Sequence, residues 1–343
     1  MYRHIIVGRG LIGSAAARHL SSWQDGVAVI GPDEPSDRQQ HEGVFASHYD
    51  EGRITRVYDP SPEWSITAAR SIERYSEIEA ESGISFFTPA GFLKIVGEED
   101  PDIKPTVALT RENGGNATTI SARIMRELYP FLSLPDNCAG IQETETAGYL
   151  SPRNLVKAQT AIAEKQGAHI VRAAATSISV NSTSVSVTTD DGQTLEAERV
   201  LVATGGYAGA CKLLPRQLAI TVYGRTVLLI KITDMAAEVL SRMPTVIDRY
   251  SGSYILPPIR YPDGNLYLKL GMGTEADPKL TTREDLTSWF RSTGSERNRL
   301  ELTALPSRHA ATAWERKART IGAMPPPGCL KAGTGITRFR ASS

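Results

Sequence analysis

Two arginines stand three residues apart in the stretch SHYDEGRITRVYD, residues 47–59. A guanidinium is always charged and presents a planar fork of donors, so Arg53 and Arg56 could hold an anion such as a carboxylate in a two-pronged contact. The alternative is that both arginines pair with Asp50 and Glu51 on a solvated face, as most surface charge clusters do. The residue types alone leave both interpretations open.

Three glycines, Gly8, Gly10 and Gly13, have the spacing G-x-G-x-x-G in GRGLIG, which follows an apolar run and opens a segment with helical spacing. The first glycine permits a tight turn, the second lets a pyrophosphate approach the backbone, and the third lets the helix pack on the strand. The helix N-terminus attracts the anion. The motif, with Leu11 and Ile12 between its glycines, predicts dinucleotide binding; the alternative is a purely structural turn.

The same fingerprint predicts an acid at the end of the second strand, where its carboxylate accepts hydrogen bonds from the ribose hydroxyls. Gly31 takes that place and is followed by Pro32, Asp33 and Glu34. We therefore expect the ribose ligand to be supplied late, by Asp33 or Glu34. The alternative is that both are solvent-exposed loop acids.

Hydrophobic periodicity indicates the elements that position these residues. Residues 4–7, the helix opened by GRGLIG and the run GVAVIGP give strand, turn, helix and strand within about thirty residues, the length of a βαβ unit. Amphipathic helices are predicted over residues 63–82 and 152–167. The second is opened by Ser151-Pro152 and closed by a glycine.

Strand patterns dominate further along the chain. Residues 168–202 alternate with period two around an Asp-Gly pair, which predicts a hairpin leading into a buried strand. From Leu218 onward, AITVYGRTVLLIKI and SYILPPIRYPDGNLYLKLGMG predict an antiparallel sheet whose last two strands meet at the PDG turn. Residues 305–343 show no strand or helix period except for one helix candidate at 310–318, and we do not expect order there.

Composition narrows the class of protein. The chain has 343 residues, a net charge of zero and 41% apolar residues, enough for one large domain or two interlocked ones. It lacks the charge excess typical of nonspecific nucleic-acid or anionic-membrane binding. It also lacks the run of about 20 apolar residues that a membrane span needs, and the start MYRHIIVGRG has no secretory pattern. We expect a cytoplasmic protein without nucleic-acid or membrane partners; its oligomeric state is not predicted.

The three cysteines, Cys138, Cys211 and Cys329, lie far apart in the sequence. None belongs to a CxxC pair, and no run of His and Cys has the spacing of a zinc site. We therefore expect neither a disulfide scaffold nor a metal centre.

A family resemblance rests on the order of several motifs. GRGLIGSAAARHL, HYDEGRITR, TPAGFLKI, GYLSPRNLVKAQ, VLVATGGYAG and LYLKLGMG follow one another as in FAD-dependent amine oxidases. The sequence resembles the monomeric sarcosine oxidase and N-methyltryptophan oxidase branch of the D-amino-acid oxidase superfamily, from Tyr2 to about Asp277. The order and spacing of the motifs, rather than any single one, carry this resemblance.

The resemblance implies a role for three charged residues. It places Arg53 beside the isoalloxazine ring of FAD and gives Arg56 the carboxylate of an amino-acid substrate. It also implies that Lys269, in LKLG, lies over the flavin face and activates oxygen. A fixed ammonium there would stabilise the superoxide-like charge that forms when O2 takes an electron. The alternative for Lys269 is a strand lysine that points to solvent.

Three other residues follow from the same resemblance, and a fourth, Tyr254, is a candidate for the substrate pocket. Thr204 and Gly205 match the strand-end turn where small residues let the backbone pass close to the dinucleotide. His48 takes the place of a histidine near the flavin, although a hydrogen-bonded loop histidine is an equal alternative. Tyr254 would line the substrate pocket; the alternative is a core aromatic on a strand.

The family pattern is not recognisable in the C-terminal part. Cys329, in PPPGCLKAG, does not match the stretch whose cysteine carries a covalent flavin bond, and Lys331 lacks the expected glycine-phenylalanine turn before it. Two explanations compete: a truncated or frame-altered gene, which we favour, and a natural branch that closes its site differently. In either case we expect FAD to be bound noncovalently.

The expected fold is α/β, with a doubly wound, Rossmann-like FAD-binding sheet and a second domain built on a mixed or antiparallel sheet. We assign residues 1–88 and 146–217 to the FAD-binding domain, to which 304–343 could belong. Residues 89–145 and 218–303 form the substrate domain.

The expected function is FAD-dependent oxidation of the C–N bond of a small secondary amine or N-methyl amino acid. Hydride passes to the flavin, water hydrolyses the imine, and O2 reoxidises the flavin to give H2O2. The alternatives are a primary (D-)amino-acid oxidase, an amine dehydrogenase with an acceptor other than O2, and a non-catalytic dinucleotide-binding remnant.

Overall fold

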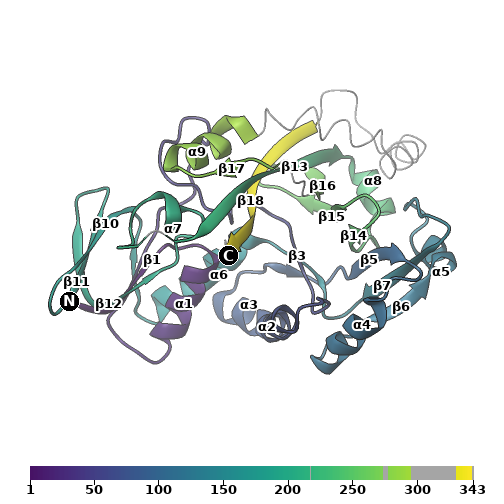
Figure 1. Ribbon diagram of the computed structural model, residues 1–343, viewed down its shortest axis with the longest axis horizontal. Helices are drawn as coiled ribbons and strands as arrows, with labels where there is room; N and C mark the ends of the chain where they lie inside the picture. Colours follow the sequence, from purple (N-terminus) through teal and green to yellow (C-terminus); the bar gives the residue numbers. More distant parts are fainter. Residues whose placement is uncertain (217, 273–276, 295–329, 342–343) are drawn as a thin grey trace.

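The computed structural model describes residues 1–216, 218–272, 277–294 and 330–341, with no account of side chains from 330 onward. Two large sheets share the molecule, one at the left of Figure 1 with the N-terminus and one that extends from the upper centre to the lower right. The helix candidate at 310–318 and Cys329 lie outside the described residues.

The first sheet has its strands in the order β10-β11-β12-β1-β2-β9. Their bounds are β1 (Tyr2–Val7), β2 (Val27–Ile30), β9 (His169–Val171), β10 (Ala175–Val180), β11 (Val185–Thr189) and β12 (Thr194–Val202). Strands β12, β1, β2 and β9 run parallel, and β10 and β11 extend the sheet as an antiparallel hairpin. The predicted βαβ unit and hairpin are confirmed. Strand β12 is half-exposed rather than buried, because only alternate residues of its first half face the core.

Two helices cover one face of this sheet: α1 (Leu11–Ser21) and α6 (Pro152–Lys165), which pack against each other. Successive strand residues point to opposite faces, so Ile6 and Val29 pack with Ala17 of α1 and Ala163 of α6. Helix α6 begins as predicted, because the Ser151 side chain accepts the Asn154 N–H at its N-terminus.

The second sheet has the order β17-β13-β16-β15-β14-β5-β7-β6, with β18 on β13. Its strands are β5 (Phe92–Gly97), β6 (Thr118–Ser121), β7 (Cys138–Glu143), β13 (Ile220–Ile232), β14 (Thr245–Asp248), β15 (Ser253–Arg260), β16 (Leu266–Met272), β17 (Lys279–Leu280) and β18 (Leu330–Ala341). The predicted antiparallel pairing of β13, β15 and β16 is confirmed, and β5 and β14 form a parallel pair in the same sheet.

Strand β18 departs from the sequence-based expectation of no order in residues 305–343. It runs antiparallel to β13 from Leu330 opposite Ile230 to Ala341 opposite Ile220, and Figure 1 shows it in yellow alongside β13. The long β13 has one side paired with β16 and offers backbone donors and acceptors on the other. Backbone groups need no hydrophobic period to pair, so the pattern could not reveal this strand.

A small third sheet has the order β3-β8-β4, with β3 (Arg53–Thr55), β4 (Phe87–Thr88) and β8 (Gly148–Leu150). The remaining helices are α2 (Pro62–Glu73), α3 (Tyr75–Ser82), α4 (Ile103–Glu112), α5 (Ala122–Leu128), α7 (Tyr207–Ala210), α8 (Asp234–Val239) and α9 (Arg283–Ser288), which continues into a π-helical segment, Trp289–Thr293. No helix in the described ranges has the length and apolar character to cross a bilayer.

The single helix predicted over residues 63–82 is two helices, α2 and α3. The Arg74 N–H between them bonds back to the carbonyl oxygens of Ile72 and Ser71. This tighter hydrogen bonding interrupts the regular i to i−4 ladder without any Pro or Gly that the sequence could have shown.

Candidate active site and dinucleotide cavity

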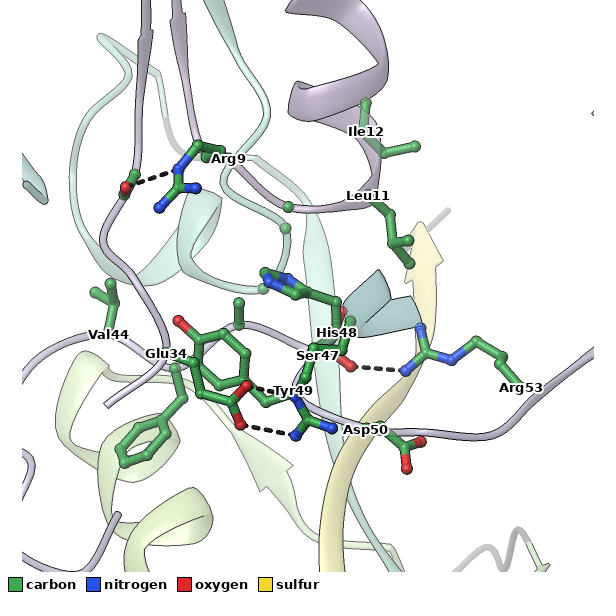
Figure 2. Close-up of a pocket in the computed structure, with 18 of the residues that line it drawn as sticks. Arg9, Leu11, Ile12, Glu34, Val44, Ser47, His48, Tyr49, Asp50 and Arg53 are labelled. Carbon is green, nitrogen blue, oxygen red and sulfur yellow. Dashed lines mark hydrogen bonds and ion pairs between the residues drawn. The ribbon is translucent and has the colours of Figure 1, made fainter. Parts of the chain in front are cut away.

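A cavity of about 900 Å³ lies where the carboxyl ends of β1, β2 and β12 meet the second sheet. This volume is near the upper end of ordinary ligand pockets, so the cavity is larger than a single amino acid needs. The sequence-predicted site residues that line it are Gly8, Gly10, Leu11, Ile12, His48, Arg53, Arg56, Thr204, Gly205, Tyr254 and Lys269. Figure 2 shows Leu11 and Ile12 at the start of α1, across from His48 and Arg53.

The glycine turn has three distinct environments. Gly8 has φ +107°, and a Cβ there would lie 2.4 Å from the carbonyl oxygen of Ala203. A Cβ on Gly13 would lie 1.6 Å from the carbonyl oxygen of Gly8. These two glycines are therefore required by the packing of the chain itself. A Cβ on Gly10 would meet only the Nδ1 atom of His48, at 3.9 Å, so the space beside Gly10 is open.

Buried polar atoms around this turn lack partners. The hydroxyls of Ser14 and Thr204 and the Nδ1 atom of His48 have no hydrogen-bond partner among the described residues. The start of α1 borders the same cavity through Gly10, Leu11 and Ile12, and Gly10 gives the helix no side-chain cap. Free donors and acceptors of this kind fit a bound pyrophosphate and its attached groups, so the residues present suit a dinucleotide.

At the end of β2, the chain lacks the ribose-binding acid that the G-x-G-x-x-G fingerprint predicts. A Cβ on Gly31 would lie 2.6 Å from the backbone nitrogen of Arg9, so Arg9 excludes an acid from that position. The Asp33 side chain is 60% exposed and pairs with Arg9, and Asp33 does not line the cavity. Its position does not support the predicted ribose contact. Glu34 does line the cavity, but Arg153 holds both of its oxygens, at 2.5 and 2.8 Å.

The two arginines of the RITR stretch have different partners. Arg53 donates to the carbonyl oxygen of Ser47 at 2.6 Å, as the dashed line in Figure 2 marks. Arg56 pairs with Asp59 at 3.3 Å and lies 5.1 Å from the centre of the Phe92 ring. The alternative in which both arginines pair with Asp50 and Glu51 is therefore wrong.

A buried carboxylate, which the sequence did not reveal, fixes the backbone just after Arg56. Glu143 is fully buried at the end of β7. It accepts the N–H groups of Val57 and Tyr58, at 3.0 and 2.9 Å, and the Thr146 hydroxyl at 2.6 Å. The chain that carries Arg56 is thus fixed to the second sheet.

Lys269 is 4% exposed, so the solvent-facing alternative is wrong. Its ammonium donates to the carbonyl oxygen of Gly52, at 2.7 Å, and to the carboxylate of Asp50. Tyr261 donates to the other oxygen of Asp50 at 3.2 Å. Sequence reasoning missed Asp50 and Tyr261 as site residues, because Asp50 and Lys269 are 219 positions apart.

Tyr254 lies on β15 and lines the cavity. A Cβ on Gly271 would come within 2.4 Å of its ring, so Gly271 makes room for the aromatic side chain.

Among the described residues, no group of three or more His, Cys, Asp and Glu side chains has the arrangement of a metal site.

His48 gives a pH-dependent prediction for the cofactor-free protein. Burial lowers the pKa of His48 from 6.5 to about 4. The unfolded chain therefore binds a proton at a higher pH than the folded chain, and the folded state loses stability as the pH falls from 6.5 towards 4. We expect His48 to account for a loss of about 2–3 kcal/mol between pH 7 and pH 4.5.

Urea unfolding of wild type and His48→Asn at several pH values measures this contribution. The variant should show a shallower loss of stability on acidification, so that the stability difference between the two proteins changes by about 2–3 kcal/mol between pH 7 and pH 4.5. Equal pH slopes in the two proteins would contradict a buried, neutral His48.

Comparisons with known proteins agree with this architecture. A family model described as FAD dependent oxidoreductase matches residues 3–305. N-methyl-L-tryptophan oxidase of Yersinia pestis (strain Pestoides F) is 26% identical over 206 residues, which cover 60% of this chain and 53% of that protein. The chain thus spans about half the length of the curated relatives it matches.

Two solved structures share the fold. NikD, described as an unusual amino acid oxidase essential for nikkomycin biosynthesis, superposes with a TM-score of 0.70 at 18% identity, over 100% of this chain and 82% of NikD. L-proline dehydrogenase from P. horikoshii superposes with a TM-score of 0.66 at 17% identity, over 98% of this chain and 82% of that one. The predicted α/β fold, with a Rossmann-like domain and a second sheet domain, is confirmed.

Proposed function

Because its match to the family model extends over most of its length, the chain belongs to the FAD-dependent oxidoreductase family, and we propose that it oxidises the C–N bond of a small secondary amine or N-methyl amino acid. This proposal rests on one observation: the start of α1, the buried Lys269 and the partly buried Arg56 line the same cavity. A helix start of this kind suits an anion. The name of N-methyl-L-tryptophan oxidase supports the substrate class.

The residues proposed to hold FAD lie at the carboxyl ends of the first sheet. The open side of Gly10 and the start of α1 suit the pyrophosphate. The hydroxyl of Thr204 and the Nδ1 atom of His48, which have no partner in the part of the chain that the structure describes, are available to a bound dinucleotide. We keep the division into residues 1–88 with 146–217 for FAD and 89–145 with 218–303 for the substrate as part of this proposal.

When bound, FAD supplies the redox chemistry: it takes hydride from the carbon beside the amine nitrogen, and water then hydrolyses the imine. The chain supplies orientation and charge. In our proposal Arg56 holds the substrate carboxylate, Arg53 lies beside the flavin, Tyr254 lines the substrate pocket, and Lys269 provides a fixed positive charge.

We also propose that the cofactor is bound noncovalently. Of the cysteines that the structure describes, Cys211 lines the cavity, and burial raises the pKa of its thiol. A thiol kept protonated in this way is a poor nucleophile towards the flavin.

Visible spectroscopy and a substrate screen test the proposal together. The purified protein, or the protein reconstituted with FAD, is expected to be yellow and to release its colour on acid precipitation. N-methyl amino acids are then expected to bleach the flavin without oxygen and to give H2O2 in air. A protein that refuses added FAD would overturn the proposal, and colour retained in the pellet would overturn noncovalent binding.

A dehydrogenase with another electron acceptor is the second candidate. The specific observation in its favour is the carboxylate of Asp50, which neutralises Lys269. An artificial acceptor, added in parallel with the peroxide assay, distinguishes the two candidates.

A further inference from the structure

The buried lysine of the cavity is part of an ion pair. The Lys269 ammonium contacts the Asp50 carboxylate and the carbonyl oxygen of Gly52, and Tyr261 donates to the same carboxylate. The Asp50 side chain is 20% exposed, and both members of the pair line the cavity. The charge that faces a bound molecule is therefore that of a pair and not that of a lone cation.

The chain around Asp50 fixes this pair. A Cβ on Gly52 would lie 2.5 Å from Cδ1 of Ile259, so the loop lies directly against the second sheet and beneath Lys269. The Glu51 N–H also donates to Asp50, at 2.9 Å. The carboxylate is held in place by three donors, from Lys269, Tyr261 and its own backbone neighbour.

Asp50 stays ionised in this setting. Burial alone would raise the pKa of Asp50, but the charge of Lys269 and its hydrogen bond outweigh burial and lower the pKa. The neighbouring acids have their own partner, since Glu34, which lines the cavity, and Glu51, which does not, both pair with Arg153. Asp50 is thus the acid that determines the charge around Lys269.

The effect on electron transfer follows from charge. Conversion of O2 to H2O2 takes two electrons and two protons from reduced FAD and solvent, and the first electron places a negative charge on the oxygen. A lone ammonium stabilises that charge strongly in a dry site. A carboxylate at hydrogen-bond distance cancels much of this field, because the attraction of the ammonium and the repulsion of the carboxylate act over nearly the same distance.

We propose that Asp50 is a positioning residue that acts through Lys269 to slow electron transfer to O2, so that another two-electron acceptor can compete for the reduced cofactor. This inference rests on the proposed function only in requiring that the cavity bind FAD. The inference gives Asp50 influence over which electron acceptor reoxidises the cofactor, and it makes no statement about the amine substrate.

Two measurements on FAD-loaded protein test the role of Asp50 without any amine substrate. The first is the second-order rate with which O2 reoxidises flavin that was reduced by light. The second is the equilibrium dissociation constant of sulfite, which forms an anionic adduct with oxidised flavin and so reports nearby positive charge. Asp50→Asn should raise the second-order rate constant for reoxidation by O2 and lower the dissociation constant of sulfite, each by at least about tenfold.

Further variants separate charge from structure. Lys269→Met should change both quantities in the opposite direction, and the double variant should lie between the two single variants, because it removes the attraction of the ammonium and the repulsion of the carboxylate together. Glu51→Gln is the matched control, since it removes a carboxylate that pairs with Arg153 instead. If this control changes both quantities as much as Asp50→Asn does, the effect is not specific to the pair and the inference fails.

Tyr261→Phe keeps the inference testable if Asp50→Asn does not fold or load FAD. Removing this donor leaves more negative charge on Asp50, so the O2 rate should fall about two- to threefold and sulfite should bind more weakly. Unchanged or faster reoxidation in Tyr261→Phe, or unchanged values in a folded, FAD-loaded Asp50→Asn, would overturn the role of Asp50. Failure of every amine to reduce the flavin would instead count against the proposed function.

Discussion

Replacement of Arg56 by alanine is expected to lower kcat/KM for an N-methyl amino acid by about 30- to 1000-fold. The guanidinium lines the cavity with its side chain 25% exposed, and its Nε atom has no hydrogen-bond partner among the described residues. Loss of one partner from a buried, hydrogen-bonded charge pair costs about 2–4 kcal/mol, and each 1.4 kcal/mol is a factor of about ten.

The measurement that isolates the carboxylate compares two substrates on each enzyme. An N-methyl amino acid should be strongly affected by Arg56→Ala, whereas the corresponding N-methyl amine without a carboxylate should be oxidised at similar rates by both proteins. Anaerobic flavin reduction gives the same comparison without the oxygen step. Arg260→Ala is the control, because Arg260 is exposed and pairs with Asp234 outside the cavity.

Two outcomes would contradict the assignment of Arg56. Equal losses for the acid and the amine would indicate a structural role, through the contacts with Asp59 and Phe92. Unchanged kinetics for both substrates would remove Arg56 from the substrate site.

The second large effect concerns the glycines of GRGLIG. Gly10→Ala should leave the stability of the FAD-free protein within about 0.5 kcal/mol of wild type, because the new Cβ meets no atom closer than 3.9 Å. It should weaken FAD binding by at least about 100-fold, since the second glycine of this motif is where the pyrophosphate approaches the backbone.

Gly13→Ala should behave in the opposite way. Its Cβ would lie 1.6 Å from the carbonyl oxygen of Gly8, so the strand and helix must move apart even without a ligand. We expect the FAD-free protein to lose about 3 kcal/mol or more, or not to fold.

Urea unfolding of the FAD-free proteins and fluorescence titration with FAD measure the two effects separately. Gly10→Ala is the informative variant because it keeps the fold. If it binds FAD as wild type does, the pyrophosphate does not pass Gly10. The turn would then have only the structural role considered in the sequence analysis.

Local sequence was sufficient for much of the first sheet. The turn at Gly8, the start of α1 and the Ser151 cap of α6 depend on residues within a few positions of each other. Such features are set by backbone sterics and short-range hydrogen bonds, which a sequence displays directly. The order of the motifs then led to the family, and the family model confirms it.

Local sequence was less informative about the ribose-binding acid expected after β2 and about strand β18. Gly31 marked the place of a missing ribose ligand, but only the structure shows that the backbone of Arg9 occupies the space. Strand β18 has no period of its own, and its partner β13 lies about a hundred positions earlier. Backbone pairing of this kind depends on which edge the fold leaves available.

The sequence by itself determined the βαβ turn, the antiparallel strands β13, β15 and β16 of the second sheet and the presence of two arginines and a lysine with the right chemistry. Only the tertiary structure decided which charges meet: Lys269 pairs with Asp50, Arg153 with Glu34 and Glu51, and Arg56 remains beside Asp59. The physical reason is that charge pairing is settled by distance in space, and these partners, except for Arg56 and Asp59, come from segments about a hundred or more residues apart.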